Sequence, residues 1–141
     1  MAISLRKART IIRKALEKGR ELDLKPLSVV VLDAGGHVQA FEREDGASPG
    51  RFQIAHGKAH GAVMFGAPSS VIGEIAKERP HFGAALSGVY GGQIVPVPGG
   101  VLIKDKKGAI IGAVGVTGDT SENDAAAALA GIEAAGLVGV V

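Results

Sequence analysis

Glycine is the residue that most constrains how this chain can fold. It occupies 22 of the 141 positions, whereas aromatic residues make up only 4% of the chain. A backbone this rich in glycine suits tight turns and close approach between segments. With so few rings, the core must be built from Val, Ile, Leu and Ala. The glycines follow no fixed period, which excludes collagen-like and solenoid architectures.

Length and composition predict one globular domain over residues 1–141, with 46% hydrophobic and 21% charged residues. The chain has no cysteine, which excludes disulfides, thiolate metal sites and cysteine nucleophiles. The segment Met1–Lys7 is not followed by the apolar stretch of a signal peptide. No run reaches the roughly 18 apolar residues of a membrane span. We therefore expect a cytoplasmic protein that does not interact with a membrane.

Charge is unevenly distributed along the chain. The net charge is +2, but residues 1–25 hold eight basic and three acidic side chains, so this segment carries +5 and the remainder −3. A basic helix could bind nucleic acid. No nucleic-acid motif or aromatic side chain accompanies the charge, however, so we expect a solvated or subunit-facing helix and no nucleic-acid partner.

Hydrophobic periodicity and turn residues predict the order helix, hairpin, helices, hairpin, helix. The predicted helices span residues 3–22, 51–66, 69–77 and 120–135, and the predicted hairpins span 27–43 and 101–116. Residues 80–100, rich in glycine and proline, are predicted to form a long loop. Hairpins form antiparallel sheets, so the expected class is α+β, with a central antiparallel β-sheet flanked by helices.

The predicted helix 51–66 contains the residues that point most clearly to chemistry. His56 and His60 are four residues apart and therefore share one face of the helix. This spacing suits two imidazoles on one metal, one haem ligand with a helper, or a surface or interface pair without a ligand. Lys58 falls in an apolar stripe with Ile54 and Phe65. A lysine there either extends its ammonium to solvent or is partly buried, and the stripe suggests partial burial. A buried lysine would contact an anionic ligand, act as an acid–base group or bond carbonyls structurally.

Two further segments could contact a ligand. Thr117 and Asp119 lie between a strand of small residues and a helix capped by Thr120 or Ser121, where free N–H groups suit an anion but Asp119 could equally be a cap. Tyr90 precedes one glycine pair, and a second pair follows at Gly99 and Gly100. Paired glycines suggest a backbone brought close to a ligand or to another chain, although turn construction also explains them.

Several segments, in order and over nearly the whole chain, resemble the GlcG/HbpS family. They are VVLDAGGH at 30–37, AFEREDGA at 40–47, FGAPS at 65–69, PGGV at 98–101 and IGAVGVTG at 111–118. The resemblance implies a profilin-like layered domain with a central antiparallel sheet, assembled into oligomers that are commonly built from dimers. Some relatives bind haem as extracellular redox sensors, others are fused to corrinoid adenosyltransferases, and the name-giving member lies with glycolate-use genes.

Three functions remain open from the sequence. The first is a binding protein for haem, a corrinoid or another small organic ligand. The second is a cofactor-free isomerase or lyase acting on a small organic acid, with Lys58, His60 and Asp119 as candidate catalytic groups. The third is a purely structural partner.

No metal site is assigned from the sequence. The expected partners are a small ligand and further copies of the chain, because Gly57, Gly61 and the glycine-rich segment 88–100 permit close packing. The expected ligand contacts are His56, Lys58, His60, Tyr90, Gly99, Gly100, Thr117 and Asp119.

Overall fold

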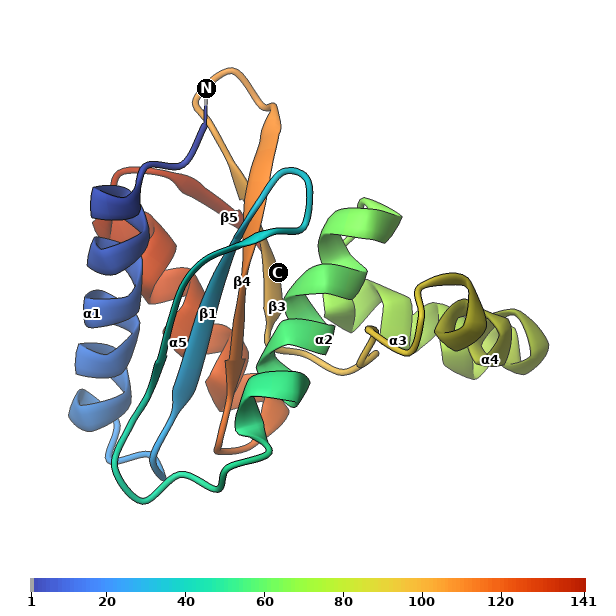
Figure 1. Cartoon of the computed structure of the whole chain (residues 1–141), viewed down its shortest axis with the longest axis horizontal. Helices are drawn as coiled ribbons and strands as arrows, with labels where there is room; N and C mark the ends of the chain where they lie inside the picture. The colour runs from blue at the N-terminus through green and yellow to red at the C-terminus, as the bar shows by residue number, and fades with distance from the viewer. Residues whose placement is uncertain (1) are drawn as a thin grey trace.

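The structure is a computed structural model that describes residues 2–141. Five helices and five strands form an α+β fold, which confirms the predicted class (Figure 1). The elements are α1 (Leu5–Glu21), β1 (Ser28–Asp33), β2 (Val38–Arg43), α2 (Arg51–Phe65), α3 (Ser69–Glu78), α4 (Pro80–Val89), β3 (Gly100–Lys104), β4 (Ile110–Thr117), α5 (Ser121–Ala134) and β5 (Val138–Val140).

The sheet joins the two predicted hairpins side by side. Its strand order is β2-β1-β4-β3-β5, and every neighbouring pair is antiparallel. The seam between the hairpins is the pairing of β1 with β4, in which Val31 lies opposite Val114. Both seam strands are buried almost throughout, as expected for strands that are covered by helices on each face.

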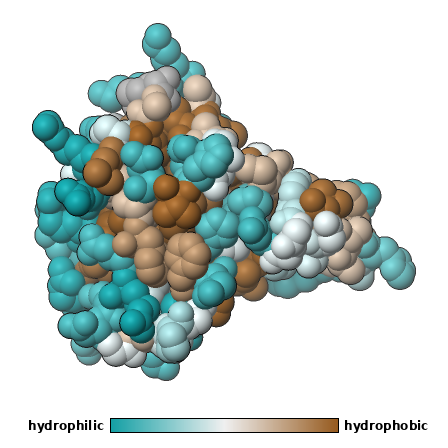
Figure 2. All heavy atoms as spheres, in the orientation of Figure 1, coloured by the Kyte–Doolittle hydropathy of each residue, from teal (hydrophilic) through white to brown (hydrophobic). Residues whose placement is uncertain are grey.

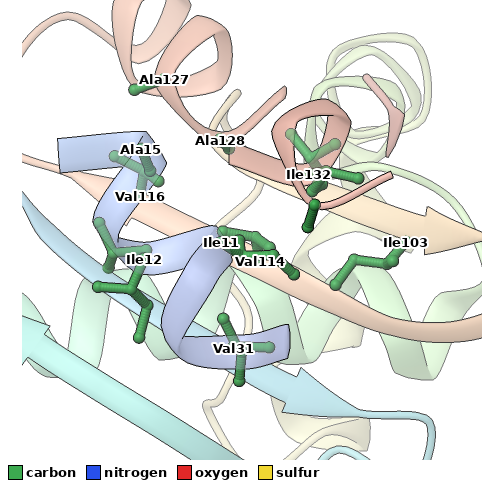
Figure 3. Close-up of a cluster of buried hydrophobic side chains, with 14 of the residues drawn as sticks. Ile11, Ile12, Ala15, Val31, Ile103, Val114, Val116, Ala127, Ala128 and Ile132 are labelled. Atoms are coloured by element: carbon green, nitrogen blue, oxygen red, sulfur yellow. The ribbon is translucent and has the colours of Figure 1, made fainter. Parts of the chain in front are cut away.

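Helices cover both faces of the sheet. In Figure 1, α1 and α5 lie together on one face and α2 lies on the other. The larger core lies under α1 and α5 and consists of aliphatic side chains, several of which are drawn in Figure 3: Ile11, Ile12, Val31, Ile103, Val114, Val116 and Ile132. The smaller core lies under α2 and combines β-strand side chains such as Val30 and Leu32 with the alanines of the helix.

The prediction of a long loop over residues 80–100 is wrong, because its first half is the helix α4. Pro80 occupies the first turn, where its missing N–H costs nothing, and Ala84, Ala85 and Leu86 are good helix formers. Gly83 serves helix packing here, since a Cβ at this position would lie 2.7 Å from the Cβ of Ala76 on α3. Glycine therefore marks a helix–helix contact rather than a turn.

Helices α3 and α4 form an arm that projects away from the sheet (Figure 1). Helix α4 packs against α3 and, within its own ten residues, buries only Leu86. At the root of the arm, the rings of Phe65 and Phe82 lie 6.2 Å apart, and the guanidinium of Arg79 lies 4.4 Å from the centre of the Phe82 ring. Within the arm, α4 thus has fewer buried side chains than α3, which buries Ser69 and Ile72.

The short edge strand β5 was not predicted. Its three residues pair with β3 after the turn at Gly136, whose φ of 79° favours glycine. Three residues are too few for an alternating pattern to be recognised in a sequence.

Candidate functional site

Five rings form a continuous row across the solvent-facing side of α2. Neighbouring ring centres are 4.9 Å apart for Phe41 and Phe52, 5.6 Å for Phe52 and His56, 5.2 Å for His56 and His60, and 6.5 Å for His60 and Tyr90. All five side chains are partly buried. We call this set the ring row. It contains three of the five Phe and Tyr residues of the chain.

Three separate segments bring the ring row together. Phe52, His56 and His60 follow one another at four-residue spacing, so they lie on one face of α2. Phe41 comes from the edge strand β2, and Tyr90 is the C-cap of α4. In Figure 2, hydrophobic atoms gather over the middle of the view, where β2 and α2 lie in front in Figure 1, whereas the α1 side is mostly hydrophilic.

A carbonyl group fixes how His60 presents its imidazole. The Nδ1 atom of His60 lies 2.8 Å from the backbone oxygen of Gln93, which can only accept a hydrogen bond. Nδ1 therefore carries a proton, and in the neutral ring Nε2 holds the free lone pair. Histidines that bind metals usually make this kind of outer contact, which orients the ring.

The neighbouring imidazole of His56 is uncharged over a wider pH range than an ordinary histidine. Burial lowers its pKa, and the adjacent His60 lowers it further. The two rings are nearly parallel, with an angle of 21° between their planes. The row thus offers two adjacent imidazoles on an apolar surface.

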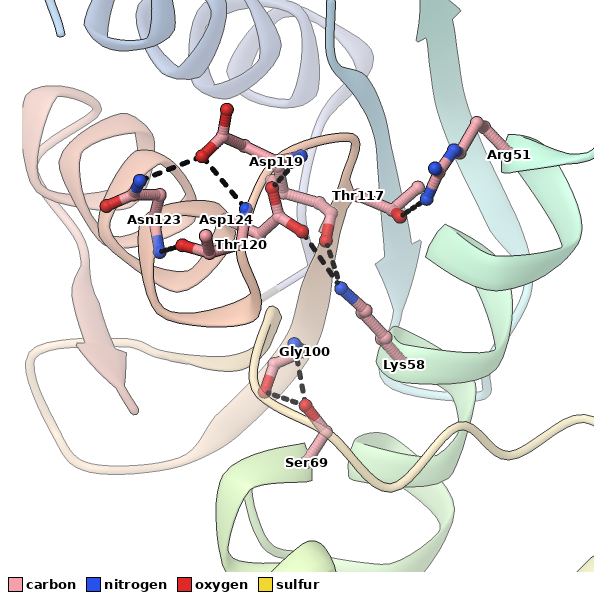
Figure 4. Close-up of polar contacts among 10 residues, drawn as sticks. Arg51, Lys58, Ser69, Gly100, Thr117, Asp119, Thr120, Asn123 and Asp124 are labelled. Carbon is pink, nitrogen blue, oxygen red and sulfur yellow. Dashed lines mark hydrogen bonds and ion pairs between the residues drawn. The ribbon is translucent and has the colours of Figure 1, made fainter. Parts of the chain in front are cut away.

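Lys58 lies on the opposite side of α2, in the core. It is 2% exposed, and its Nζ donates to the backbone oxygen of Val116 at 3.0 Å and to Oδ2 of Asp124 at 3.2 Å (Figure 4). The other carboxylate oxygen of Asp124 accepts from the backbone N–H of Asp119 at 2.9 Å. Lys58 is buried, as its apolar stripe predicts, but its acidic partner Asp124 was not among the sequence candidates.

Burial dominates the electrostatics of this pair. It lowers the pKa of Lys58 against the opposing charge of Asp124, and it raises the pKa of Asp124 against the hydrogen bond from Asp119 and the charge of Lys58. Both directions mean that the ionised pair is costly to bury. Through the hydrogen bonds of Lys58 to Val116 and to Asp124, the pair connects α2 with β4 and α5.

Thr117 and Asp119 are also engaged within the fold. Thr117 accepts a hydrogen bond from the Arg51 guanidinium at 2.9 Å. The Asp119 carboxylate accepts from the Asn123 side chain and from the backbone N–H groups of Lys25 and Thr120, which lowers its pKa to about 2. Thr120 caps α5 by accepting from the Asn123 N–H. This helix start is therefore capped by its own residues.

The pair Gly99 and Gly100 approaches α2 of the same chain. A Cβ on Gly99 would lie 2.8 Å from Nζ of Lys58, and a Cβ on Gly100 would collide with the Lys58 backbone. Gly100 also donates its N–H to the Ser69 hydroxyl at 2.7 Å. The glycines on α2 behave similarly, because Gly57 packs against Val95 and Gly61 against Ile94.

The eight predicted site residues thus separate into two groups. The first group, His56, His60 and Tyr90, belongs to the ring row. The second group is Lys58, which forms the buried ion pair, together with nearby Gly99, Gly100, Thr117 and Asp119. Because Lys58 and His60 lie on different sides of α2, the structure gives no support to an enzyme that uses them together. Sequence reasoning missed Phe41, Phe52, Asp124 and the Gln93 carbonyl, of which only Phe52 carried a signal, its helical spacing from His56.

Over residues 2–141, no helix is both long and apolar enough to cross a membrane. In the same part of the chain, no group of three or more His, Cys, Asp or Glu side chains is placed to hold a metal ion.

Most of the chain is similar to known proteins in both sequence and structure. A family model described as haem degrading protein HbpS-like matches residues 3–133. The crystal structure of a PduOC–heme complex aligns with a TM-score of 0.84 at 25% identity, covering 95% of both chains. A double mutant of Streptomyces reticuli HbpS aligns with a TM-score of 0.82 at 28% identity, covering 94% of this chain and 86% of that one.

Klebsiella pneumoniae protein ORFY is similar as well, with a TM-score of 0.83 at 25% identity over 95% of this chain and 90% of that one. Among curated proteins, none matches this sequence.

Proposed function

Because this chain belongs to the HbpS-like family, we propose that it binds haem along the ring row, with His60 as the iron ligand. The observation that carries the proposal is the ring row itself. A chain poor in aromatic residues places three of its five Phe and Tyr side chains beside two imidazoles on a partly exposed surface. A flat apolar macrocycle needs such walls together with a few polar groups that orient it.

The relatives support the same choice of ligand. The PduOC structure is a complex with heme, and it covers 95% of this chain. Haem iron commonly takes a histidine nitrogen as its axial ligand and supplies redox and ligand-binding chemistry when bound. The free Nε2 of His60 matches that requirement, because its Nδ1–H is engaged by the Gln93 carbonyl.

Only one histidine of the pair would hold the haem iron. His56 and His60 stack on the same helix face with ring centres 5.2 Å apart. His60 would hold the iron, and His56, Phe52 and Tyr90 would contact the macrocycle.

Haem titration followed by visible absorption tests the proposal. Wild-type protein should give a Soret band characteristic of a histidine-ligated haem. His60→Ala should shift this band and weaken haem binding by at least about tenfold, since loss of even an outer-sphere partner costs 10–100-fold in metal affinity. His56→Ala should keep the band position and weaken binding less.

His81→Ala is the matched control, because His81 is exposed on α4 outside the ring row. It should titrate as the wild type does. A wild-type protein without a Soret shift, or a His60→Ala variant with the wild-type band and affinity, would contradict haem binding through His60.

A further inference from the structure

The stacked histidines His56 and His60 can act as a pair of nitrogen ligands, a property that the proposed haem binding does not use. His56 and His60 are one helical turn apart, and their nearly parallel rings project from the same face of α2. In the proposed haem complex the iron would take one of them, which would leave the second imidazole without a ligating role. Two imidazoles at this spacing can instead bind one small cation from the same side, as the paired histidines of helical zinc motifs do.

The surroundings of the pair suit a transition metal. The hydrogen bond from Nδ1 of His60 to Gln93 leaves Nε2 as the donor atom and restrains the ring. Both imidazoles are only partly buried, so a hydrated ion can reach them from solvent. One further turn along α2 lies Met64, 38% exposed, whose thioether is a soft donor.

We propose that His56 and His60 together chelate one first-row divalent cation, such as Zn²⁺ or Cu²⁺, in the absence of haem. The two imidazoles supply the protein ligands, and water, or the Met64 thioether for copper, completes the coordination. Copper binds more tightly than zinc, following the usual order for nitrogen ligands. Because His60 belongs to both sites, haem and the cation exclude each other. The proposal does not require haem to bind.

Isothermal titration calorimetry of the haem-free full chain with zinc chloride tests the site. Wild-type protein should bind one Zn²⁺ per chain. His56→Ala and His60→Ala should each weaken binding by at least about tenfold, because each removes a direct ligand and even outer-sphere losses cost 10–100-fold. His37→Ala and His81→Ala, which change exposed imidazoles outside the pair, should bind zinc as the wild type does.

A second readout reports the ligands themselves. Electron paramagnetic resonance of the Cu²⁺ form should show nitrogen couplings from two imidazoles in the wild type and from one in each single variant. The metal-free variants should still unfold cooperatively, because alanine is a good helix former at these partly exposed positions. His60→Ala should be slightly less stable, since it loses the hydrogen bond to the Gln93 carbonyl.

The zinc and haem titrations together distinguish failure of the cation proposal from failure of the haem proposal. His56→Ala should lose zinc yet keep its Soret band. Zinc binding without haem binding in the wild type would contradict only the haem proposal. No zinc binding in the wild type, unchanged zinc affinity in His56→Ala, or loss of zinc in His37→Ala would overturn the chelate.

Discussion

Lys58 stabilises the fold as one half of an ion pair, so removing its charge alone leaves Asp124 buried without its cation. Asp124 is 1% exposed. Breaking a buried pair in this way costs about 3–5 kcal/mol, more than the side-chain packing that methionine would preserve. We therefore expect Lys58→Met to lower the free energy of unfolding at pH 7 by about that amount, as measured by urea denaturation.

The double variant Lys58→Met/Asp124→Asn is the control. The asparagine amide can still accept from the Asp119 N–H but carries no charge, so most of the stability should return. No recovery in the double variant would mean that Lys58 acts through its packing rather than through its charge.

The same single variant should have a characteristic pH dependence. Burial raises the pKa of Asp124 above its ordinary value of 3.8, and loss of Lys58 removes a charge that opposes this rise. The folded state then binds the Asp124 proton at a higher pH than the unfolded state does. Stability from this proton is fully present below pH 3.8 and is lost as the pH rises through the folded-state pKa.

The deficit of Lys58→Met relative to the wild type should therefore shrink as the pH falls from 7 toward 3.8, the ordinary pKa of the carboxyl group. Urea denaturation at several pH values measures it. A deficit that stays constant or grows over this range would show that Asp124 does not take up the proton.

Individual side chains show what a sequence can and cannot predict about the site. The apolar stripe around Lys58 predicts its burial, and the four-residue spacing predicts that His56 and His60 share a face. Asp124 as the partner depends on how α5 docks against β4, and the ring row depends on Phe41 and Tyr90 arriving from distant segments. Such contacts follow from tertiary packing, which local patterns do not encode.

At the scale of elements, α4 should be the least protected helix of the molecule. It buries one side chain, whereas α1 buries six and packs along α5. Local opening needs little free energy where few apolar contacts must break. Hydrogen–deuterium exchange should therefore label the amides of 80–89 well before those of α1 and the central strands. Equal protection of α4 and α1 in a verified monomer would contradict this expectation.

The elements also show where the sequence patterns succeed. Both hairpins and the helices α1, α2, α3 and α5 are predicted within a few residues of their observed bounds, because their patterns are long and their caps distinct. Helix α4 was missed because its glycines resemble turn signals, although one of them serves contact with α3. The strand β5 is simply too short to produce a pattern.

For the whole molecule, assembly into an oligomer remains a prediction, but the residues that favour it are not the ones that the sequence suggested. Gly57 and Gly61 contact residues of the same chain, so they do not argue for a partner. The arm and the segment that follows it do. Val71 and Val89 of the arm are 41% and 68% exposed, Val97 in the following segment is 38% exposed, and exposed apolar groups of this kind favour association.

Sedimentation velocity at micromolar concentration should show a species larger than the monomer. Val89→Glu should shift the distribution toward the monomer, whereas Leu22→Glu, which changes a 43% exposed residue at the end of α1, should not. A wild type that sediments only as a monomer would refute assembly.

The pairing of β1 with β4 also affects how the chain folds during its synthesis on the ribosome. Ser28 pairs with Thr117 across it, so β1 leaves the ribosome long before its central neighbour has been translated. Until then, the nascent chain can offer β1 only its hairpin partner β2, and the other edge of a strongly apolar strand stays open. Pairings this distant in sequence slow folding and prolong exposure to aggregation. A chaperone that covers residues 29–32 during translation would therefore prevent aggregation of the nascent chain until β4 has been synthesised.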